Sequence, residues 1–410
     1  MCLRVDPWFI EIVSKEFMYR IGQEEIEELR CVIESRQLFR SGNAAGGHQQ
    51  EVVRFEREWG ETIGRKYALC LSGGGTAALI CGLVGMEIGP GDEVIVPAYT
   101  WMATALAVLA VGAIPVLADI DESLSLDPLD LERKYTPQTR AVIPVHMTGR
   151  PANMQAICDF ARANNMFVLE DCSQADGGSY KGRRVGSWGD AGAFSFNDYK
   201  IMTCGEGGAL VTDDLTIYER ALVYHDAGTA FRPYGQDLSI PIFLGQQYRA
   251  SELMGAVLRI QLQRLDGILS DLRRMKNAFH EQLSDVANLR FAPGNDPEGD
   301  CGVLVAFQFD DEASARAFAS APGVEGGVPI DSDKHVYTNW TPILEKNIGH
   351  HPAVNPYNYS QNQNLRTDIS NETCAKTLGI LARTVYLAMN PDWTDEQLQA
   401  RIACCRDAMK

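Results

Sequence analysis

The sequence predicts an α/β protein with a large domain built on a parallel sheet and a second, smaller α/β domain. Short apolar runs alternate with helical patterns through the middle of the chain, as they do where helices cross over between buried parallel strands. A helical pattern from Ser251 to Val286 follows, and strand and helix patterns then alternate again from about Leu289. A chain of 410 residues also exceeds the usual size of one domain.

Six apolar runs are predicted to be strands of the large sheet. They are DEVIVPA (Asp92–Ala98), AIPVLADI (Ala113–Ile120), RAVIPVH (Arg140–His146), NMFVLED (Asn165–Asp171), GAFSF (Gly192–Phe196) and GGALVTDD (Gly207–Asp214). Between them, LDPLDLERKY and PANMQAICDFARANN have the spacing of helices. In the C-terminal part, VLVAFQFDDEASARAFASA combines a strand pattern with a helix pattern.

These elements divide the chain into four predicted parts. Residues 1–60 form a charged helical lead with the glycine-rich loop SGNAAGGHQQ, and residues 61–255 form the large domain. Residues 256–288 form the connecting helix, and residues 289–410 form the small domain.

The balance of charges argues against nucleic acid and membrane partners. The chain has 37 Lys and Arg against 54 Asp and Glu, a formal net charge of -17. The N-terminal MCLRVDPWFIEIV is too acidic, and its apolar run too short, for a secretory signal. The membrane-like run from Ala98 to Ala118 contains Gly112 and Pro115 and has acidic residues on both sides, which predicts a helix followed by a buried strand.

The eleven cysteines are scattered, with no CxxC pair and no spacing typical of a zinc site. We therefore expect no metal centre, reduced thiols and a cytoplasmic location.

A glycine turn precedes an apolar helix in LSGGGTAALICGL, Leu71 to Leu83. Backbone N–H groups at a helix N-terminus, with the hydroxyl of Thr76 beside them, are suited to bind a phosphate. The pattern fits a tight turn with an N-cap equally well. It is not a Walker A loop, because no lysine follows the glycines at the required spacing.

Asp171 ends a predicted buried strand in VLEDCSQADGG. A carboxylate at the carboxyl end of a parallel strand lies where α/β proteins bind ligands, and it commonly holds a cation or a protonated ring nitrogen. A helix N-cap or a buried salt bridge is the alternative.

Lys200 lies between two predicted buried strands in FSFNDYKIMTCGEGGAL. It is either a solvated turn residue or a desolvated lysine, and a desolvated lysine loses its proton easily enough to form a Schiff base. Trp101 follows another strand, where an aromatic ring either stacks on a planar ligand or packs in the core. Together, the four features supply a phosphate site, a stacking ring, an acid for a pyridinium nitrogen and a reactive lysine, which pyridoxal 5'-phosphate (PLP) requires.

Five motifs carry a family resemblance. They are GGGTAAL, GPGDEVIVPAYTWMATALAVLAVGAIPVLADID, VIPVHMTGRPANM, LEDCSQADGGSYKGRRVGSWGDAGAFSF and TCGEGGALVTDD. In order and spacing they resemble the sugar aminotransferases of the DegT/DnrJ/EryC1/StrS family, from about Phe39 to the C-terminal WTDEQLQARI. The resemblance implies a PLP-dependent transaminase with the fold-type I fold of aspartate aminotransferase, a mixed or parallel sheet of seven strands, and a homodimer with shared active sites.

The resemblance also implies roles for single residues. Lys200 would form the Schiff base with PLP and move the proton between substrate and cofactor, and Asp171 would pair with the pyridine nitrogen. Gln174 would contact the ring oxygen of the cofactor, and Trp101 would stack on its ring. The phosphate would be held by Gly75, Thr76 and Ser195.

The chain departs from the family pattern at QQYRASE, where Gln247 replaces the asparagine that reaches the phosphate in the other subunit. Its longer side chain keeps the amide needed for that contact. Arg249 matches the family's arginine and is the candidate for binding a carboxylate of the amino donor, with an interface salt bridge as the alternative. Three further candidates for substrate contacts are Arg40, His335 and Asn339.

Several acceptors and reactions fit the resemblance. PVHMTGRPANM, KIMTCGEGGA, NDPEGD and WTDEQ are similar to a subgroup, the 8-amino-3,8-dideoxy-manno-octulosonate transaminases, which use glutamate and an eight-carbon keto sugar acid. Octoses and nucleotide-linked hexoses are alternative acceptors, and glutamine is an alternative donor. A PLP-dependent sugar dehydratase or epimerase is a different reaction, although Lys200 argues against the dehydratase branch, which carries histidine there. A non-catalytic relative is the third possibility.

Overall fold

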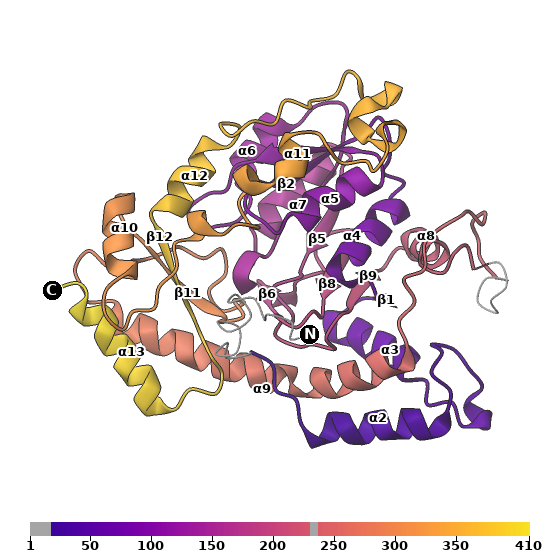
Figure 1. Ribbon diagram of the computed structural model, residues 1–410, viewed down its shortest axis with the longest axis horizontal. Coiled ribbons are helices and arrows are strands. Elements are labelled where there is room, and N and C mark those ends of the chain that lie inside the picture. Colours follow the sequence, from indigo (N-terminus) through magenta and orange to yellow (C-terminus); the bar gives the residue numbers. More distant parts are fainter. Residues whose placement is uncertain (1–17, 230–236) are drawn as a thin grey trace, which may run out of the picture.

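A computed structural model describes residues 18–229 and 237–410 of the chain. The N-terminal MCLRVDPWFIEIV and the first part of the predicted lead lie outside the described residues. Figure 1 shows a large central sheet flanked by helices, a smaller sheet at one end, and one long helix that joins the two.

A seven-stranded sheet in the order β1-β9-β8-β5-β4-β2-β3 forms the centre of the large domain. Its strands are β1 (Tyr67–Leu71), β2 (Glu93–Pro97), β3 (Ile114–Ala118), β4 (Thr139–Val142), β5 (Phe167–Asp171), β8 (Ala191–Ser195) and β9 (Gly208–Thr212). All six predicted runs are strands of this sheet, and the expected α/β class with a mixed seven-stranded sheet is confirmed. The run YALCL, which forms β1, is not among the predicted strands.

β9 runs antiparallel to both of its neighbours, β1 and β8, whereas the pairs among β8, β5, β4, β2 and β3 are parallel. The antiparallel direction of β9 relative to β8 follows from the connection between these two strands. β8 ends at Ser195 and β9 begins at Gly208, with no helix between them. A chain that returns without a crossover pairs antiparallel. The return places the loop that carries Lys200 at the carboxyl end of β8.

Helices cover both faces of the sheet (Figure 1). One face packs against α4 (Gly74–Gly85), α5 (Ala103–Ala110) and α8 (Leu215–His225), and the other against α3 (Glu51–Ile63), α6 (Pro128–Lys134), α7 (Met154–Ala163) and α9 (Glu252–Leu283). Neighbouring residues of one strand serve the two faces, since Leu169 packs with α4 and Val168 with α7. Burial on both faces explains why these strands are continuous apolar runs.

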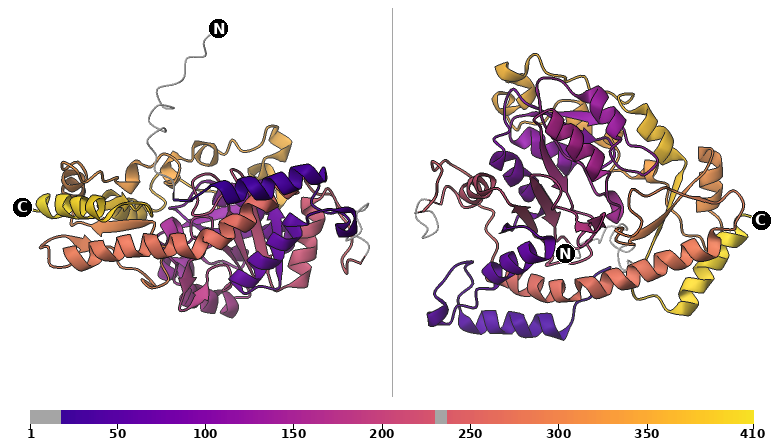
Figure 2. Two further views of the ribbon diagram at one scale, coloured as in Figure 1. Left: turned by 90° about the horizontal axis from the view of Figure 1, so that it is seen from below. Right: turned by 180° about the vertical axis from the view of Figure 1, so that it is seen from behind.

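The helix α9 connects the large sheet to the small domain, as Figure 2 shows from two further sides. Ser251 caps it by accepting a hydrogen bond from the backbone N–H of Met254. Apolar residues at helical spacing, among them Leu258, Leu265 and Leu272, are fully or almost fully buried along its length. The charged helix α2 (Gln23–Ser35) packs against α9 from the side away from the sheet.

The small domain contains a three-stranded antiparallel sheet, β10 (Arg290–Phe291), β11 (Leu304–Gln308) and β12 (Thr384–Ala388). Its helices are α10 (Glu312–Ala319), α12 (Ala375–Ala382) and α13 (Asp395–Asp407). The stretch VLVAFQFDDEASARAFASA forms β11 and α10, as predicted. Smaller elements are the strand pair β6 (Ser179–Tyr180) and β7 (Arg183–Arg184) and the helix α11 (Thr341–Leu344).

The motif NDPEGD holds the two domains together. The Asn295 side-chain amide donates to the hydroxyls of Ser123 and Ser125, both at 3.0 Å. Asp300 forms a buried ion pair with Lys276 of α9, with 2.5 Å between Oδ2 and Nζ. The motif is therefore a structural contact between domains.

Part of the C-terminal region returns to the large sheet. The backbone N–H of Thr100 donates to the carbonyl of His335 at 3.0 Å, and Tyr337 and Trp340 are buried against the α4 and α5 side of the sheet. This return brings residues near position 335 to the carboxyl end of β2. The domain division at residues 60, 255 and 288 stays a prediction.

Ala98 to Ala118 forms α5 and β3, which is the predicted helix and buried strand. Within residues 18–229 and 237–410, no helix has both the length and the apolar character needed to cross a bilayer. The ten cysteines in these ranges are free thiols.

Candidate active site

The first turn of α4 packs closely against the ends of β5 and β8. A methyl group added at Gly75 would lie 2.6 Å from Oγ of Ser173 and 3.0 Å from Cβ of Ser195. Only glycine leaves this space open, so the helix N-terminus, Ser173 and Ser195 surround one small volume. Thr76 follows in the same turn and is half-buried. Backbone N–H groups and hydroxyls around such a space suit a phosphate.

Asp171 is 4% exposed at the carboxyl end of β5. Its Oδ2 accepts a 2.8 Å hydrogen bond from the hydroxyl of Thr104 in α5, and its Oδ1 accepts one of 3.1 Å from the backbone N–H of Ser173. Each carboxylate oxygen can accept a second hydrogen bond. Asp171 is therefore fixed in orientation and retains capacity for a protonated ring nitrogen.

Glu170, which precedes Asp171 in β5, forms a buried pair with His146. Nε2 of His146 is 3.1 Å from Oε2 of Glu170, and the backbone N–H of Ala152 donates to Nδ1 of His146, so that Nε2 carries the proton. Glu170 also accepts hydrogen bonds from the backbone of the turn at residues 186–189. With Cys172 these residues form a group that is close enough to hold a metal ion, all within 4.8 Å. Since the His and Glu hydrogen bonds are already satisfied within the protein, we assign the pair a structural role.

Lys200 is half-buried in the loop between β8 and β9. Burial lowers its pKa, the carboxylates of Asp176, Asp171 and Glu206 raise it, and the ammonium of Lys334 lowers it, with a net decrease. An amine with a lowered pKa is more readily uncharged and nucleophilic.

Gln174 and His335 meet beside this loop. Oε1 of Gln174 accepts a 2.9 Å hydrogen bond from the backbone N–H of Thr148, and its Nε2 lies 3.5 Å from Nε2 of His335. Burial, helped by the charges of Lys334 and Lys200, lowers the pKa of His335 to about 4. The imidazole is therefore uncharged at neutral pH.

Trp101 forms one wall of the site. It is 42% exposed and contacts His335 edge-on, with 5.7 Å between ring centroids. Nζ of Lys334 lies 5.1 Å from the Trp101 ring and 5.9 Å from the ring of Tyr199, which is 50% exposed. An aromatic wall with a cation above it is suited to a ring that carries negative groups.

Gln247 and Arg249 lie on a second, neighbouring segment. Arg249 pairs as an isolated bridge with Leu71, and the carbonyl of Tyr248 accepts a 2.7 Å hydrogen bond from the backbone N–H of Ser72, just before the glycine turn. Gln247 is exposed. Arg249 forms an ion pair with the buried Asp226 of the same chain, and its Nε has no hydrogen-bond partner within the described residues.

The structure thus brings together most of the predicted site residues. Gly75 packs against Ser195. His335 contacts both Gln174 and Trp101. The charges of Asp171 and Lys200 interact. Arg40 is paired with Glu56 and lies 2.9 Å from His225, beside the segment of Arg249, and Asn339 is exposed.

Sequence analysis missed Thr104, Ser173, Asp176 and Lys334. Thr104 is a hydroxyl within an apolar helix, and that anomaly in a buried run was an available signal. Lys334 had no such signal in the sequence, because only the return of the C-terminal region brings it to the site.

These residues fit PLP. Gly75 brings a helix N-terminus against the hydroxyl-bearing side chains of Ser173 and Ser195, Asp171 offers a fixed acceptor, and Lys200 supplies an amine with a lowered pKa.

Known proteins resemble this chain in sequence and in structure. It is 36% identical over 240 residues to the GDP-perosamine synthase of Escherichia coli O157:H7, which covers 58% of this chain and 64% of that protein. It is 32% identical to the spore coat polysaccharide biosynthesis protein SpsC of Bacillus subtilis over 95% of each chain. The crystal structure of S. venezuelae DesV in complex with a ketimine intermediate superposes with a TM-score of 0.75 at 27% identity, over 94% of each chain.

For several curated relatives, the match spans only 63% to 65% of their own length. The family model for DegT/DnrJ/EryC1/StrS aminotransferases matches residues 20–318. This match and the structural likeness confirm the predicted family of aminotransferases and its fold type, and PLP is the cofactor of that family. The chain belongs to the DegT/DnrJ/EryC1/StrS aminotransferase family.

Proposed function

We propose that this protein is a PLP-dependent sugar aminotransferase, which moves the amino group of glutamate or glutamine onto a keto or aldehydo sugar in amino-sugar biosynthesis. The single observation that carries the proposal is the state of Lys200. This amine has a lowered pKa, and its charge interacts with that of Asp171. Family membership supports the same activity.

Each predicted residue has a task in this reaction. PLP, when bound, supplies the electron sink that stabilises negative charge on the substrate carbon. Asp171, oriented by Thr104, would accept a hydrogen bond from the protonated ring nitrogen. Lys200 would hold the cofactor covalently and, as a free amine, would move the proton of the substrate carbon.

The remaining residues hold the cofactor in place. Gln174, whose Oε1 accepts a hydrogen bond from the backbone N–H of Thr148, would contact the ring oxygen through its amide N–H. Trp101 would stack on the ring. Gly75, Thr76 and Ser195 would hold the phosphate.

A homodimer completes the site in this proposal. Gln247 is exposed and follows the loop at residues 237–246, in which Leu244 is 90% exposed. An apolar side chain this exposed is suited to an interface. Gln247 would then reach the phosphate in the other subunit. Arg249 would bind the donor carboxylate in place of Asp226, with which it forms an ion pair in this structure.

The acceptor that we infer is an eight-carbon keto sugar acid. Lys334, an exposed cation beside Trp101 with no ion pair among the described residues, is suited to an anionic acceptor. A nucleotide-linked keto hexose is the second candidate, because one relative is named GDP-perosamine synthase. Both candidates carry negative groups.

The experiment loads the purified enzyme with PLP and glutamate, removes the oxoglutarate, and adds candidate acceptors one at a time. Each true acceptor should restore the visible absorbance of the aldehyde form of the cofactor and yield an amino sugar by mass spectrometry. Return of the absorbance with the eight-carbon acid but not with a GDP-linked keto hexose supports the first acceptor, and the reverse supports the second. Sugar turnover without consumption of an amino donor would contradict the proposal and favour a dehydratase or an epimerase.

A further inference from the structure

Residues 18–22, which precede α2, reach the loop that carries Lys200. The hydroxyl of Tyr19 donates a 2.8 Å hydrogen bond to Oδ1 of Asp198, two positions before the lysine. Tyr19 and Asp198 are 179 positions apart in the sequence, and both are half-buried. Burial and the carboxylate of Asp198 raise the pKa of Tyr19 to about 12, so the phenol keeps its proton and is the donor. The proposed mechanism gives this contact no role.

Arg20 fixes the same segment to α9 and to the C-terminal region. Its guanidinium lies 2.8 Å from a carboxylate oxygen of Asp271 in α9 and 2.7 Å from one of Asp392. Its carbonyl oxygen accepts a 2.6 Å hydrogen bond from Nε2 of Gln261, which is also in α9. Two carboxylates and a buried amide thus hold the residue that follows Tyr19.

Gln261 connects Arg20 to the part of the loop that follows the lysine. The Gln261 side chain is 0% exposed, and its Oε1 accepts a 3.4 Å hydrogen bond from the backbone N–H of Thr203, three positions after Lys200. The Thr203 hydroxyl donates at 3.1 Å to the carbonyl of Phe196, where the loop begins. A buried amide is costly unless its hydrogen bonds are made, and Gln261 makes them with both the segment and the loop.

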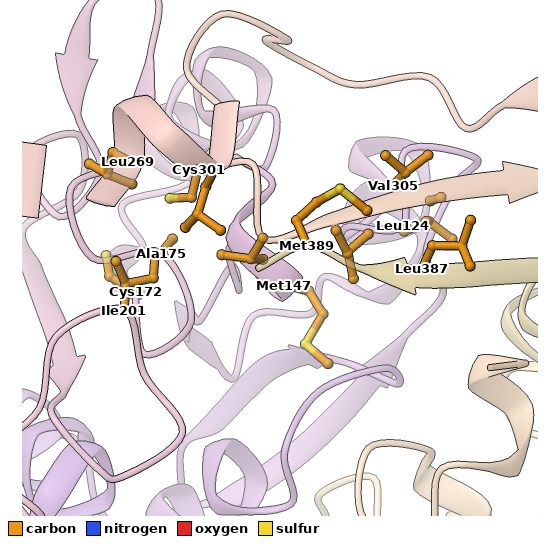
Figure 3. Packing of buried hydrophobic residues seen from close by; sticks show 14 of the residues in the cluster. Leu124, Met147, Cys172, Ala175, Ile201, Leu269, Cys301, Val305, Leu387 and Met389 are labelled. Atoms are coloured by element: carbon orange, nitrogen blue, oxygen red, sulfur yellow. The ribbon is translucent and has the colours of Figure 1, made fainter. Parts of the chain in front are cut away.

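The two halves of the loop are anchored in different ways. After Lys200, Ile201 is 1% exposed, and Figure 3 shows it in the same buried cluster as Leu269 of α9. Before the lysine, Asp198 is half-buried, and the residue that follows it is 50% exposed. Apolar packing therefore fixes the second half, whereas the first half depends on polar contacts such as that with Tyr19.

We propose that Tyr19 and Arg20 form a strap that positions the Lys200 loop. Tyr19 holds the loop before the lysine through Asp198, and Arg20 holds it after the lysine through Gln261. Lys200 lies between these two contacts, so together they limit how far its amine can move. This limit matters because a group that transfers a proton must stay within hydrogen-bond reach of the reacting atom. Tyr19 is thus a positioning residue that acts through Asp198.

This inference rests on the proposed function only for the use of Lys200 as the reacting amine. The test measures hydrogen exchange of the peptide that spans residues 196–205, in the full-length chain before PLP is added. Four backbone N–H groups of this peptide are hydrogen-bonded, those of Tyr199, Lys200, Thr203 and Cys204. Their exchange therefore reports how often the loop opens.

Tyr19→Phe removes the hydroxyl and keeps the ring. The loop peptide should then exchange about tenfold faster, because hydrogen bonds to charged groups are worth roughly this factor or more, and other peptides should keep their rates. Tyr359→Phe is the matched control. The Tyr359 hydroxyl donates at 3.2 Å to the carbonyl of Val354, and its ring lies beside Gly112, which precedes β3 at the opposite end of the sheet. This control should leave the loop unchanged.

Two variants at position 198 test whether the effect acts through the carboxylate. Asp198→Asn keeps an acceptor oxygen and should retain most of the protection. Asp198→Ala removes the acceptor and should raise exchange as much as Tyr19→Phe does, and the double variant should exchange no faster than either single variant. If Tyr19→Phe does not fold, Asp198→Ala is compared with Tyr359→Phe instead. In the PLP-loaded enzyme, Tyr19→Phe should lower kcat by about three- to tenfold and leave KM for glutamate nearly unchanged.

Unchanged exchange of the loop peptide in Tyr19→Phe, or the same increase in Tyr359→Phe, would overturn the proposal. An increase spread evenly over the whole chain would also overturn it, because Tyr19 would then only stabilise the fold. Faster exchange of the loop with an unaltered kcat would show that the strap does not position the amine. Faster exchange confined to the loop, in a protein whose wild type lacks transaminase activity, would support the strap and contradict only the proposed function.

Discussion

The hydroxyl of Thr104 in α5 donates a 2.8 Å hydrogen bond to Oδ2 of Asp171 at the end of β5. The same hydroxyl lies 2.8 Å from that of Thr100, so a short chain of buried hydroxyls connects the β2 side of the sheet to the acid. A charge-assisted bond of this kind fixes the carboxylate in the orientation that a ring nitrogen needs.

Thr104→Val should weaken PLP binding by roughly ten- to hundredfold, because hydrogen bonds to charged groups contribute about 1.5–3 kcal/mol. Cofactor affinity is measured by titrating the chain with PLP and following its absorbance. The matched control is Thr212→Val, which removes a buried hydroxyl bonded to the carbonyl of Asp190 at the opposite end of the sheet. Equal affinities in the two variants would show that Thr104 does not orient Asp171 toward the cofactor.

Gly75→Ala should reduce PLP affinity by about tenfold or more, because the added methyl overfills the space between Ser173 and Ser195. The fold should persist, since alanine is favourable in a helix. Gly379→Ala, in the exposed middle of α12 with no atom within 4 Å of the added methyl, is the control and should leave PLP affinity unchanged. Unaltered PLP binding in Gly75→Ala would place the phosphate elsewhere.

Asp300→Asn should destabilise the fold by about 3–5 kcal/mol, because it leaves the buried ammonium of Lys276 without its partner. The free energy of unfolding in urea measures this change. Asp310→Asn, which breaks an exposed ion pair with Arg290 at 2.7 Å, should cost less than about 1 kcal/mol. Comparable costs in both variants would contradict the interdomain role of NDPEGD.

His335 should make stability depend on pH. Its pKa is lowered from 6.5 to about 4, so between these values the unfolded chain binds a proton that the folded chain does not. The free energy of unfolding is therefore not reduced by His335 above about pH 6.5. It falls by about 1–3 kcal/mol as the pH decreases toward about 4. His335→Gln should flatten the fall in unfolding free energy over this range, and the exposed His350→Gln should not. Parallel curves for wild type and His335→Gln would refute this.

The local pattern predicted the strands well, because strands buried on both faces must be apolar along their whole length. The direction of β9 depends on what connects Ser195 to Gly208. The strand pattern of β9 itself does not contain this direction, and the only signal in the sequence was the lack of a helical pattern in that connection. His335 lies 161 positions from Gln174 in the sequence, and nothing local to either residue indicates that they meet. Contacts of this kind arise from the path of the C-terminal region.

The site residues that the motifs carry were predictable for a different reason. Gly75, Asp171 and Lys200 each stand next to a strand end or a helix start, so the topology of the sheet suffices to bring them to one edge. Thr104 acts on Asp171 through a hydrogen bond, and Asp176 acts on Lys200 through its charge. The hydroxyl of Thr104 is an anomaly in an apolar helix, but only the folded packing identifies its partner.

The central claim is that Lys200 is the amine that binds PLP. The direct measurement reduces the PLP-loaded enzyme with borohydride, digests it, and locates the pyridoxyl group on its peptides by mass spectrometry. Our account predicts the group on Lys200, and no fixed group in Lys200→Ala, which should still bind PLP reversibly and lose transaminase turnover. A pyridoxyl group on another lysine of the wild-type chain, or normal turnover in Lys200→Ala, would contradict it.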